Sequence, residues 1–214
     1  MTRPLIIGDA SGPLPPYPLS MSGLVISGFG RGSKELGIPT ANLPVSSATN
    51  PWLDSTPSGV YFGWAALHLP ASHPDYSESK AGGQNGFTVY PMVMSIGYNP
   101  FYKNTVRSAE VHVLHKFAAD FYGVEMRLAI LGFVREELDY SGLEALIADI
   151  NLDCEVAKRS LAREGWAPRG VEVEVDVPGE GVRVVSGGEL DCDWLVRPSE
   201  GVVNGEGEAK EEEK

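Results

Sequence analysis

Residues 126–134 read MRLAILGFV, a short apolar run with several β-branched or large side chains. Four further runs of this kind are separated by Gly, Pro and Asn: residues 24–27, 60–69, 89–96 and 110–115. Short β-type segments bounded by turn residues are typical of strands. Five or six strands at this spacing favour a closed antiparallel barrel or a sandwich.

Composition leads to the same fold class. The 214 residues suffice for one domain of ordinary size with appendages. The 25 glycines and 16 prolines exceed what a helix-rich protein usually contains, so the chain is expected to be turn-rich and mainly β. The net charge of −12, with no run of Lys or Arg, excludes nucleic-acid binding as an expected function.

The remaining segments are assigned from composition. Residues 1–20, with five prolines, are expected to form an irregular arm on a domain that spans residues 21–166. Residues 70–88 are rich in Pro, Ser, Gly and Asn and predict a mobile surface insertion between paired strands. Residues 199–214 form an acidic tail that is expected to be disordered.

One long helix is predicted from Ser141 to about Arg163. Ser141 and Glu144 have the spacing of a capping box, and Gly165 provides a stop. An apolar stripe should pack on one face or end of the barrel; it comprises Leu143, Leu146, Ile147, Ile150, Cys154, Ala157 and Leu161. Beyond the helix, residues 167–198 should form a β extension, because valines alternate with acidic residues over 171–177 and residues 182–196 could pair with them.

The chain has few features of a secreted or membrane protein. Cys154 and Cys192 are too few for a disulfide framework, and no Cys/His cluster has zinc-ligand spacing. No apolar run approaches the ~18 residues of a membrane span, and the N-terminus lacks a signal-peptide core. A cytoplasmic monomer is expected, with organelle association left open.

A glycine-rich segment, SGFGRGSK at residues 27–34, leaves one predicted strand. Gly28, Gly30 and Gly32 would let the backbone pass close to a bulky anion. The segment is neither a P-loop nor a dinucleotide fingerprint, because Gly-Lys-Ser/Thr is missing and no helix follows. Taken alone, it is equally well a flexible turn.

The next segment, GIPTANLP at residues 37–44, is bracketed by prolines. Each proline holds its predecessor extended, so Thr40 and Asn42 should project from the same face. Two neutral oxygen ligands beside nucleotide phosphates suit Mg²⁺. The alternative is that the two side chains merely cap a turn.

Residues 110–115, EVHVLH, carry a candidate base. If the valines face the core, Glu110 and His112 share the opposite face. Beside a phosphate-binding loop, Glu110 could accept the proton of an attacking hydroxyl; otherwise it is a solvated surface residue. By the same spacing, His115 falls on the other face and is a packed strand residue.

Residues 118–123, AADFYG, join two predicted strands and contain the adjacent aromatics Phe121 and Tyr122. Such a loop could stack on a planar ligand or close over it. Equally, its aromatics could plug one end of a barrel.

Together these segments resemble the eukaryotic riboflavin kinases, and among them the longer fungal forms. The resemblance covers roughly residues 25–161 and is carried by GFGRGSKELGIPTANLP, SGVYFGWA, SIGYNPFYKNT, EVHVLHKFAADFYG and SGLEALIADI. It implies a six-stranded antiparallel Greek-key β-barrel with the helix packed beside it. It also implies an enzyme that transfers the γ-phosphate of ATP to the 5′-hydroxyl of riboflavin and so forms FMN.

The resemblance further implies residue roles. Glu110 would be the catalytic base, and Thr40 and Asn42 would bind Mg²⁺, with Zn²⁺ as an alternative ion. The implied nucleotide contacts are Gly28, Gly30, Gly32, Lys34, His115, Phe121 and Tyr122. The implied flavin contacts are Asn104, Thr105, Arg107 and Ser108. For His115 the resemblance takes precedence over the interpretation from spacing.

Some parts of the chain depart from the family. Residues 70–86 and those beyond about Trp166 have no counterpart in the shorter members, so no function is assigned to them. Some bacterial relatives also make FAD through a separate domain with an H-x-G-H motif, which this chain lacks. The alternative functions are a non-catalytic flavin or nucleotide carrier, which would not need Glu110, and an inactive scaffold whose acidic tail recruits a partner.

Overall fold

The computed structural model describes residues 3–27, 37–76, 83–98 and 107–198. Several predicted features therefore lie outside the described residues: Gly28, Gly30, Gly32, Lys34, Asn104, Thr105, part of the insertion and the acidic tail.

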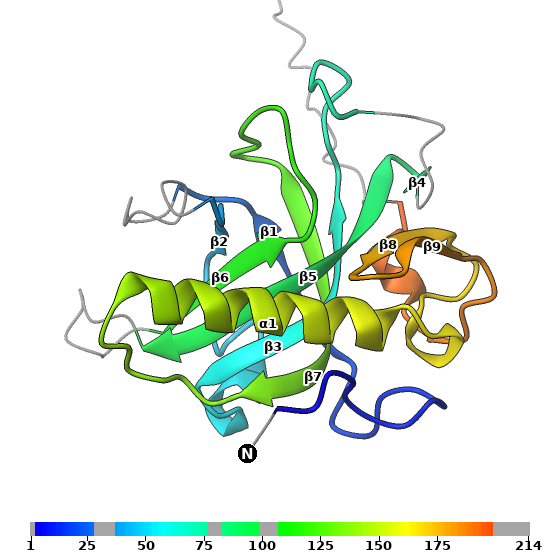
Figure 1. The fold of residues 1–214 in the computed structure, drawn as a ribbon. Coiled ribbons are helices and arrows are strands. Elements are labelled where there is room, and N and C mark those ends of the chain that lie inside the picture. Colours follow the sequence, from blue (N-terminus) through cyan, green and yellow to red (C-terminus); the bar gives the residue numbers. More distant parts are fainter. Residues whose placement is uncertain (1–2, 28–36, 77–82, 99–106, 199–214) are drawn as a thin grey trace, which may run out of the picture.

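Seven strands form one curled antiparallel sheet (Figure 1). They are β1 (Leu19–Leu24), β2 (Ala41–Leu43), β3 (Gly59–Leu67), β4 (Gly83–Gln84), β5 (Phe87–Tyr98), β6 (Arg107–Val113) and β7 (Glu125–Arg135). Their order is β1-β7-β3-β5-β6-β2, and the short β4 pairs with β5. A bridge in which the Ile26 N–H donates to the Asn42 carbonyl, at 2.9 Å, joins the two ends of this path. The predicted mainly β fold with six barrel strands is confirmed.

Apolar side chains cover both faces of the sheet. The inner face encloses an apolar core that includes Met21, Leu43, Tyr61, Met94, Val111 and Leu128. The outer face of β3, β5 and β7 is covered by a second apolar cluster, which includes Phe62, Trp64, Val93, Leu131, Ala157 and Trp166. Central strands that are buried on both faces read as continuous apolar runs, which is why the sequence predicted them well.

The helix α1 (Leu143–Leu161) crosses the outer face of the sheet (Figure 1). The predicted capping box is wrong: Gly142 is the N-cap and no side chain caps the helix. Since the helix begins two residues after Ser141, Glu144 stands at the second helical position and not at the third, where a capping box needs it. No helix in the described ranges is long and apolar enough to cross a membrane.

The N-terminal arm packs on the residues that directly follow α1. In the arm, the carbonyls of Ile7, Gly8 and Asp9 accept hydrogen bonds from the Arg163 guanidinium. Gly165 is not the predicted helix stop: it lies in the 3-10 helix η3 (Glu164–Trp166), and a side chain there would clash with the Ala10 carbonyl.

The arm is also shorter than expected. Residues 24–27 were predicted to be the first strand, whereas the structure places β1 at Leu19–Leu24. After η3, β8 (Val173–Val177) and β9 (Gly181–Val185) form the predicted antiparallel hairpin. Two further 3-10 turns are η1 (Pro51–Ser55) and η4 (Asp193–Leu195).

Candidate active site

The pairing of β2 with β6 brings one of the predicted metal ligands, Asn42, to the predicted base. Asn42 lies directly opposite Glu110. Directly opposed residues of an antiparallel pair project to the same face, so the two side chains are neighbours. The face is the outer one, because Val111 is fully buried in the barrel whereas Glu110 and His112 are partly exposed. The predicted division of this strand into two faces is confirmed.

The row of polar side chains continues onto β5, where Ser95 lies opposite Glu110. One step further along this face, Gly97 lies opposite Ser108. A Cβ atom at Gly97 would overlap the Glu137 carboxylate, so the bare glycine leaves room for this side chain. Glu137 was not predicted, because it lies on the irregular connection between β7 and α1 and belongs to no motif.

The Glu137 carboxyl has an unusual electrostatic environment. Burial raises the pKa of Glu137, and the negative charge of Glu110 contributes to the rise. The cations Arg107 and Arg135 oppose it. A second carboxyl therefore lies within electrostatic range of the predicted base.

His112 links β6 to the segment before β2. Its Nδ1 lies 2.8 Å from the Pro39 carbonyl oxygen. Burial lowers the pKa of His112; the hydrogen bond to Pro39 opposes this change, and the nearby charge of Lys158 adds to it. The sequence placed His112 on the face of Glu110 but assigned it no role.

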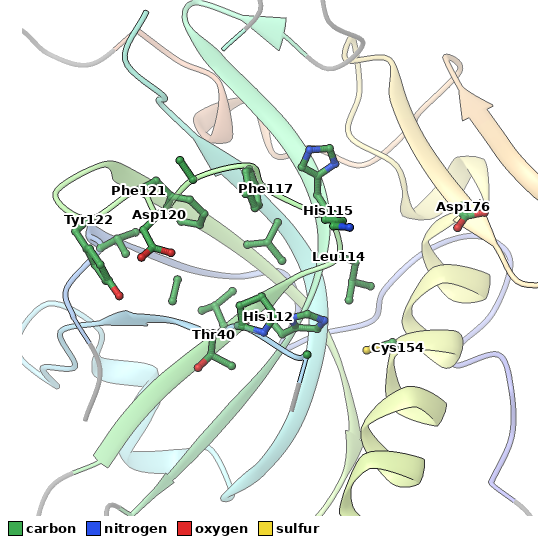
Figure 2. Close-up of a pocket in the computed structure, with 18 of the residues that line it drawn as sticks. Thr40, His112, Leu114, His115, Phe117, Asp120, Phe121, Tyr122, Cys154 and Asp176 are labelled. Atoms are coloured by element: carbon green, nitrogen blue, oxygen red, sulfur yellow. Dashed lines mark hydrogen bonds between the residues drawn. The ribbon is translucent and has the colours of Figure 1, made fainter. Parts of the chain in front are cut away.

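A groove of about 660 Å³ extends beside His112 (Figure 2). Four predicted site residues line it: Thr40, His115, Phe121 and Tyr122. Other lining residues were assigned no role in a site from the sequence, among them Asp120, Asn151, Cys154, Lys158 and Asp176. Figure 2 shows Phe121 and Tyr122 on one side of β6, and Cys154 and Asp176 on the other.

The two aromatics of the 118–123 loop have different environments. Phe121 packs against the barrel core and contacts Phe117 edge-on, with ring centroids 4.7 Å apart. Tyr122 is 60% exposed at the groove. Phe121 is thus part of the packing of the barrel, while the Tyr122 ring remains exposed where it lines the groove.

His115 is both packed and accessible. Its ring lies 4.7 Å from that of Phe117 and 4.8 Å from that of Tyr90, between centroids. Its side chain nevertheless keeps 29% of its surface exposed. Packing and a place in the groove, the two interpretations from sequence, are therefore compatible.

The start of the insertion supports this loop. The Ala118 N–H donates to Asp75 at 2.8 Å, and a ring nitrogen of His73 lies 3.2 Å from the Ala119 carbonyl oxygen. Asp75 also lies 3.9 Å from His115. No role was predicted for these residues, and no sequence pattern connects them to the loop.

Arg107 and Ser108 lie at the opposite end of β6 from His115. The Arg107 guanidinium donates to the Leu53 carbonyl and lies 5.5 Å from the centroid of the Tyr98 ring. Its Nε is buried and has no hydrogen-bond partner among the described residues. The predicted flavin and nucleotide contacts that the structure describes therefore lie on either side of Glu110.

The donor set fits a cation that shares its coordination with phosphates. Thr40, which lines the groove, and Asn42, which lies opposite Glu110, would supply neutral oxygens. Mg²⁺ typically takes one or two protein ligands with substrate phosphates and water as the rest. The described part of the chain contains no cluster of three or more His, Cys, Asp or Glu side chains that could enclose a metal ion.

Comparisons with known proteins point to a single family. Residues 15–161 match the family model Flavokinase, described as riboflavin kinase. A riboflavin kinase of Chaetomium globosum is 70% identical, over 92% of this chain and 94% of its own length. A riboflavin kinase of Neurospora crassa is 53% identical, over 91% of this chain and 97% of its own length. The solved riboflavin kinase of Trypanosoma brucei is 24% identical and has a TM-score of 0.52. The match covers 70% of this chain and 83% of that chain, and it supports the fold.

Proposed function

The chain belongs to the riboflavin kinase family, and we propose that it transfers the γ-phosphate of ATP to riboflavin with Glu110 as the base and with Thr40 and Asn42 as ligands of Mg²⁺. The observation that carries this proposal is the position of Glu110 on β6. It lies between Ser108, a candidate flavin contact, and His115, a candidate nucleotide contact. A group that mediates transfer between two substrates must reach both of them.

Glu110 would act on the riboflavin 5′-hydroxyl. A glutamate carboxylate is a weak base towards an alcohol. This suffices when the transition state is loose, because positioning and electrostatics then supply most of the rate enhancement. The role of Glu110 is therefore to orient the hydroxyl towards the γ-phosphorus and to take its proton late in the transfer.

Thr40 and Asn42 would hold the metal–phosphate end of the nucleotide. A divalent ion, when bound, neutralises charge on the β- and γ-phosphates. Asn42 is only 8% exposed and its backbone is held in the β2–β6 ladder, so its position is fixed before any ligand binds. Tyr122 at the other wall of the groove would contact the nucleotide and help to exclude water.

The replacement Glu110→Gln tests the base. We expect turnover in an ATP and riboflavin assay to fall at least about 100-fold, the usual range for loss of a general base, while the affinity for MgADP changes little. Glu144→Gln is the matched control, because Glu144 is exposed on α1. Near wild-type turnover of the Glu110 variant would show that another group takes the proton.

A flavin or nucleotide carrier on the same barrel is the competing function. It predicts that the purified chain binds riboflavin without consuming ATP. Conversion of riboflavin to FMN that depends on ATP and Mg²⁺ separates the two, and a chain that binds riboflavin but never forms FMN would support the carrier.

A further inference from the structure

His112 occupies the point at which the β2–β6 ladder stops. The ladder pairs Ala41, Asn42 and Leu43 with residues of β6. Pro39 has no N–H, so it cannot donate to a continued ladder. In its place, the ring of His112 reaches the Pro39 carbonyl at 2.8 Å. The His112 side chain thus makes a hydrogen bond to the segment before β2, just beyond the last backbone pair of the ladder.

The partner determines which ring nitrogen carries the hydrogen. A carbonyl oxygen only accepts, so Nδ1 of His112 must be the donor. This holds for the neutral ring and for the charged ring alike. The contact therefore depends on a hydrogen-bond donor at the Nδ1 position and not on the charge of His112.

The hydrogen bond acts on Thr40 through the peptide plane. The Pro39 carbonyl and the Thr40 nitrogen belong to one rigid planar unit. Holding the carbonyl therefore limits rotation of that unit and sets the direction in which Thr40 leaves the backbone. Asn42 has a separate anchor, because its own carbonyl accepts from the Ile26 N–H at 2.9 Å.

We infer that His112 is a positioning residue for metal binding: its Nδ1–H holds the Pro39–Thr40 peptide so that the Thr40 hydroxyl faces the cation shared with the nucleotide. The inference rests on the proposed role of Thr40. It predicts that His112 affects the contribution of the metal to nucleotide affinity, and that it affects neither nucleotide binding without metal nor riboflavin binding.

The test measures ADP affinity by titration calorimetry with and without Mg²⁺. The ratio of the two affinities is the gain due to the metal. His112→Leu removes the donor, and we expect it to reduce this gain about three- to tenfold, the usual effect of one neutral hydrogen bond. His112→Asn places an amide N–H near the position of Nδ1, and we expect the gain to stay within about twofold of wild type.

Three outcomes would overturn the inference: an unchanged gain in His112→Leu, an equal loss in His112→Leu and His112→Asn, or a parallel loss of riboflavin affinity. Thermal unfolding checks that each variant is folded. If the leucine variant does not fold, His112→Gln replaces it, since its longer side chain carries the amide beyond the Nδ1 position and should lose the gain as well.

Thr40→Val, measured in parallel, separates this inference from the proposed function. If Thr40→Val keeps the full gain due to the metal, the assignment of Thr40 as a ligand is wrong. If Thr40→Val loses the gain and His112→Leu keeps it, the assignment of Thr40 stands and only the role of His112 is wrong.

Discussion

The two halves of α1 are held in very different ways. The C-terminal half is buried at Asp153, Val156, Ala157, Ser160 and Leu161. In the N-terminal half no residue is buried, and Leu143 is 60% exposed. The apolar stripe predicted from sequence runs through both halves, but only its C-terminal end meets a packed surface.

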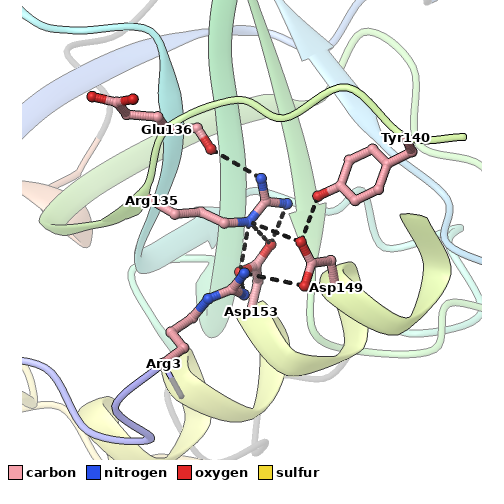
Figure 3. Close-up of polar contacts among 6 residues, drawn as sticks. All are labelled: Arg3, Arg135, Glu136, Tyr140, Asp149 and Asp153. Carbon is pink, nitrogen blue, oxygen red and sulfur yellow. Dashed lines mark hydrogen bonds and ion pairs between the residues drawn. The ribbon is translucent and has the colours of Figure 1, made fainter. Parts of the chain in front are cut away.

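The C-terminal half is bound by the arm and by β7. Asp153 accepts hydrogen bonds from Arg135 at 2.8 and 3.0 Å and also pairs with Arg3 of the arm (Figure 3). Further along, the Ile7 N–H donates to the Ser160 hydroxyl at 3.0 Å. The two contacts with the arm, from Arg3 and from Ile7, join residues that are 150 and 153 positions apart in the sequence.

The N-terminal half follows the connection that carries Glu137, beside the candidate active site. It has no side-chain cap and few buried contacts. The difference between the halves shows that the helix is anchored from the end remote from Glu137. The α1 residues that line the groove, Asn151, Cys154 and Lys158, lie in the middle of the helix and in its anchored half, so the anchoring contacts also hold this wall of the groove in place.

The largest expected effect comes from removing the packing at the anchored end. Trp166 is 2% exposed, stacks on Phe62 with centroids 5.6 Å apart, and donates to the Asp9 carbonyl at 2.7 Å. Trp166→Ala should lower the free energy of unfolding by about 3–5 kcal/mol in urea denaturation. Leu143→Ala, at the open end, should lower it by less than about 0.5 kcal/mol. Similar losses for both would show that the halves are equally anchored.

A somewhat smaller effect is expected at the ion pair. The Asp153 side chain is 2% exposed, and Asp153→Asn removes the charge that compensates the Arg135 guanidinium. Breaking a buried pair in this way should cost about 3 kcal/mol, measured by denaturant unfolding at pH 7. Asp149→Asn is the control, because that side chain is 25% exposed and its loss should cost about 1 kcal/mol or less. Equal costs would contradict the view that burial makes Asp153 the anchor.

The smallest effect is expected at Tyr140, on the connection between β7 and α1. The Tyr140 hydroxyl donates to Asp149 at 2.7 Å (Figure 3), and this bond is the main reason that the pKa of Asp149 is lowered. A lowered pKa contributes stability above the unfolded pKa of about 4, and this contribution is lost as the pH falls through the folded value.

Tyr140→Phe should therefore raise the pKa of Asp149, followed by its carboxyl carbon in an NMR titration. The variant should be less stable than wild type at pH 7, and the difference should shrink in acid. An unchanged pKa would mean that the hydroxyl does not stabilise the charged carboxylate.

Local patterns in the sequence predicted the parts of the site that depend on neighbouring residues. Strand alternation placed Glu110 and His112 on one face, because a period of two needs no tertiary information. The pairing of Asn42 with Glu110 was not predictable in this way, since it depends on the register between distant strands. Glu137 was missed because it reaches the site from an irregular connection.

The wrong predictions also have physical reasons. A side-chain cap contributes only a small free energy, so it does not decide where a helix begins. Here the N-cap is Gly142, one residue after Ser141, and this shift removes the predicted capping box. In β1 only Met21 is buried, and its neighbours are serines and a glycine. The sequence therefore lacks the alternation of apolar and polar residues that would have identified this strand. Gly165 was interpreted as a helix stop, although its role is to admit the arm, which approaches from far away in the sequence.

The pairing of β1 with β7 determines when the barrel can form during synthesis. Leu19 pairs with Ile130, so the first strand to leave the ribosome has no partner until the last barrel strand has been made. The arm can pack only later still, because its hydrogen-bond donors Arg163 and Trp166 are synthesised after β7. Such long-range pairing delays folding and leaves strand edges exposed to aggregation. The nascent chain therefore needs nearly all of its described length before the groove exists.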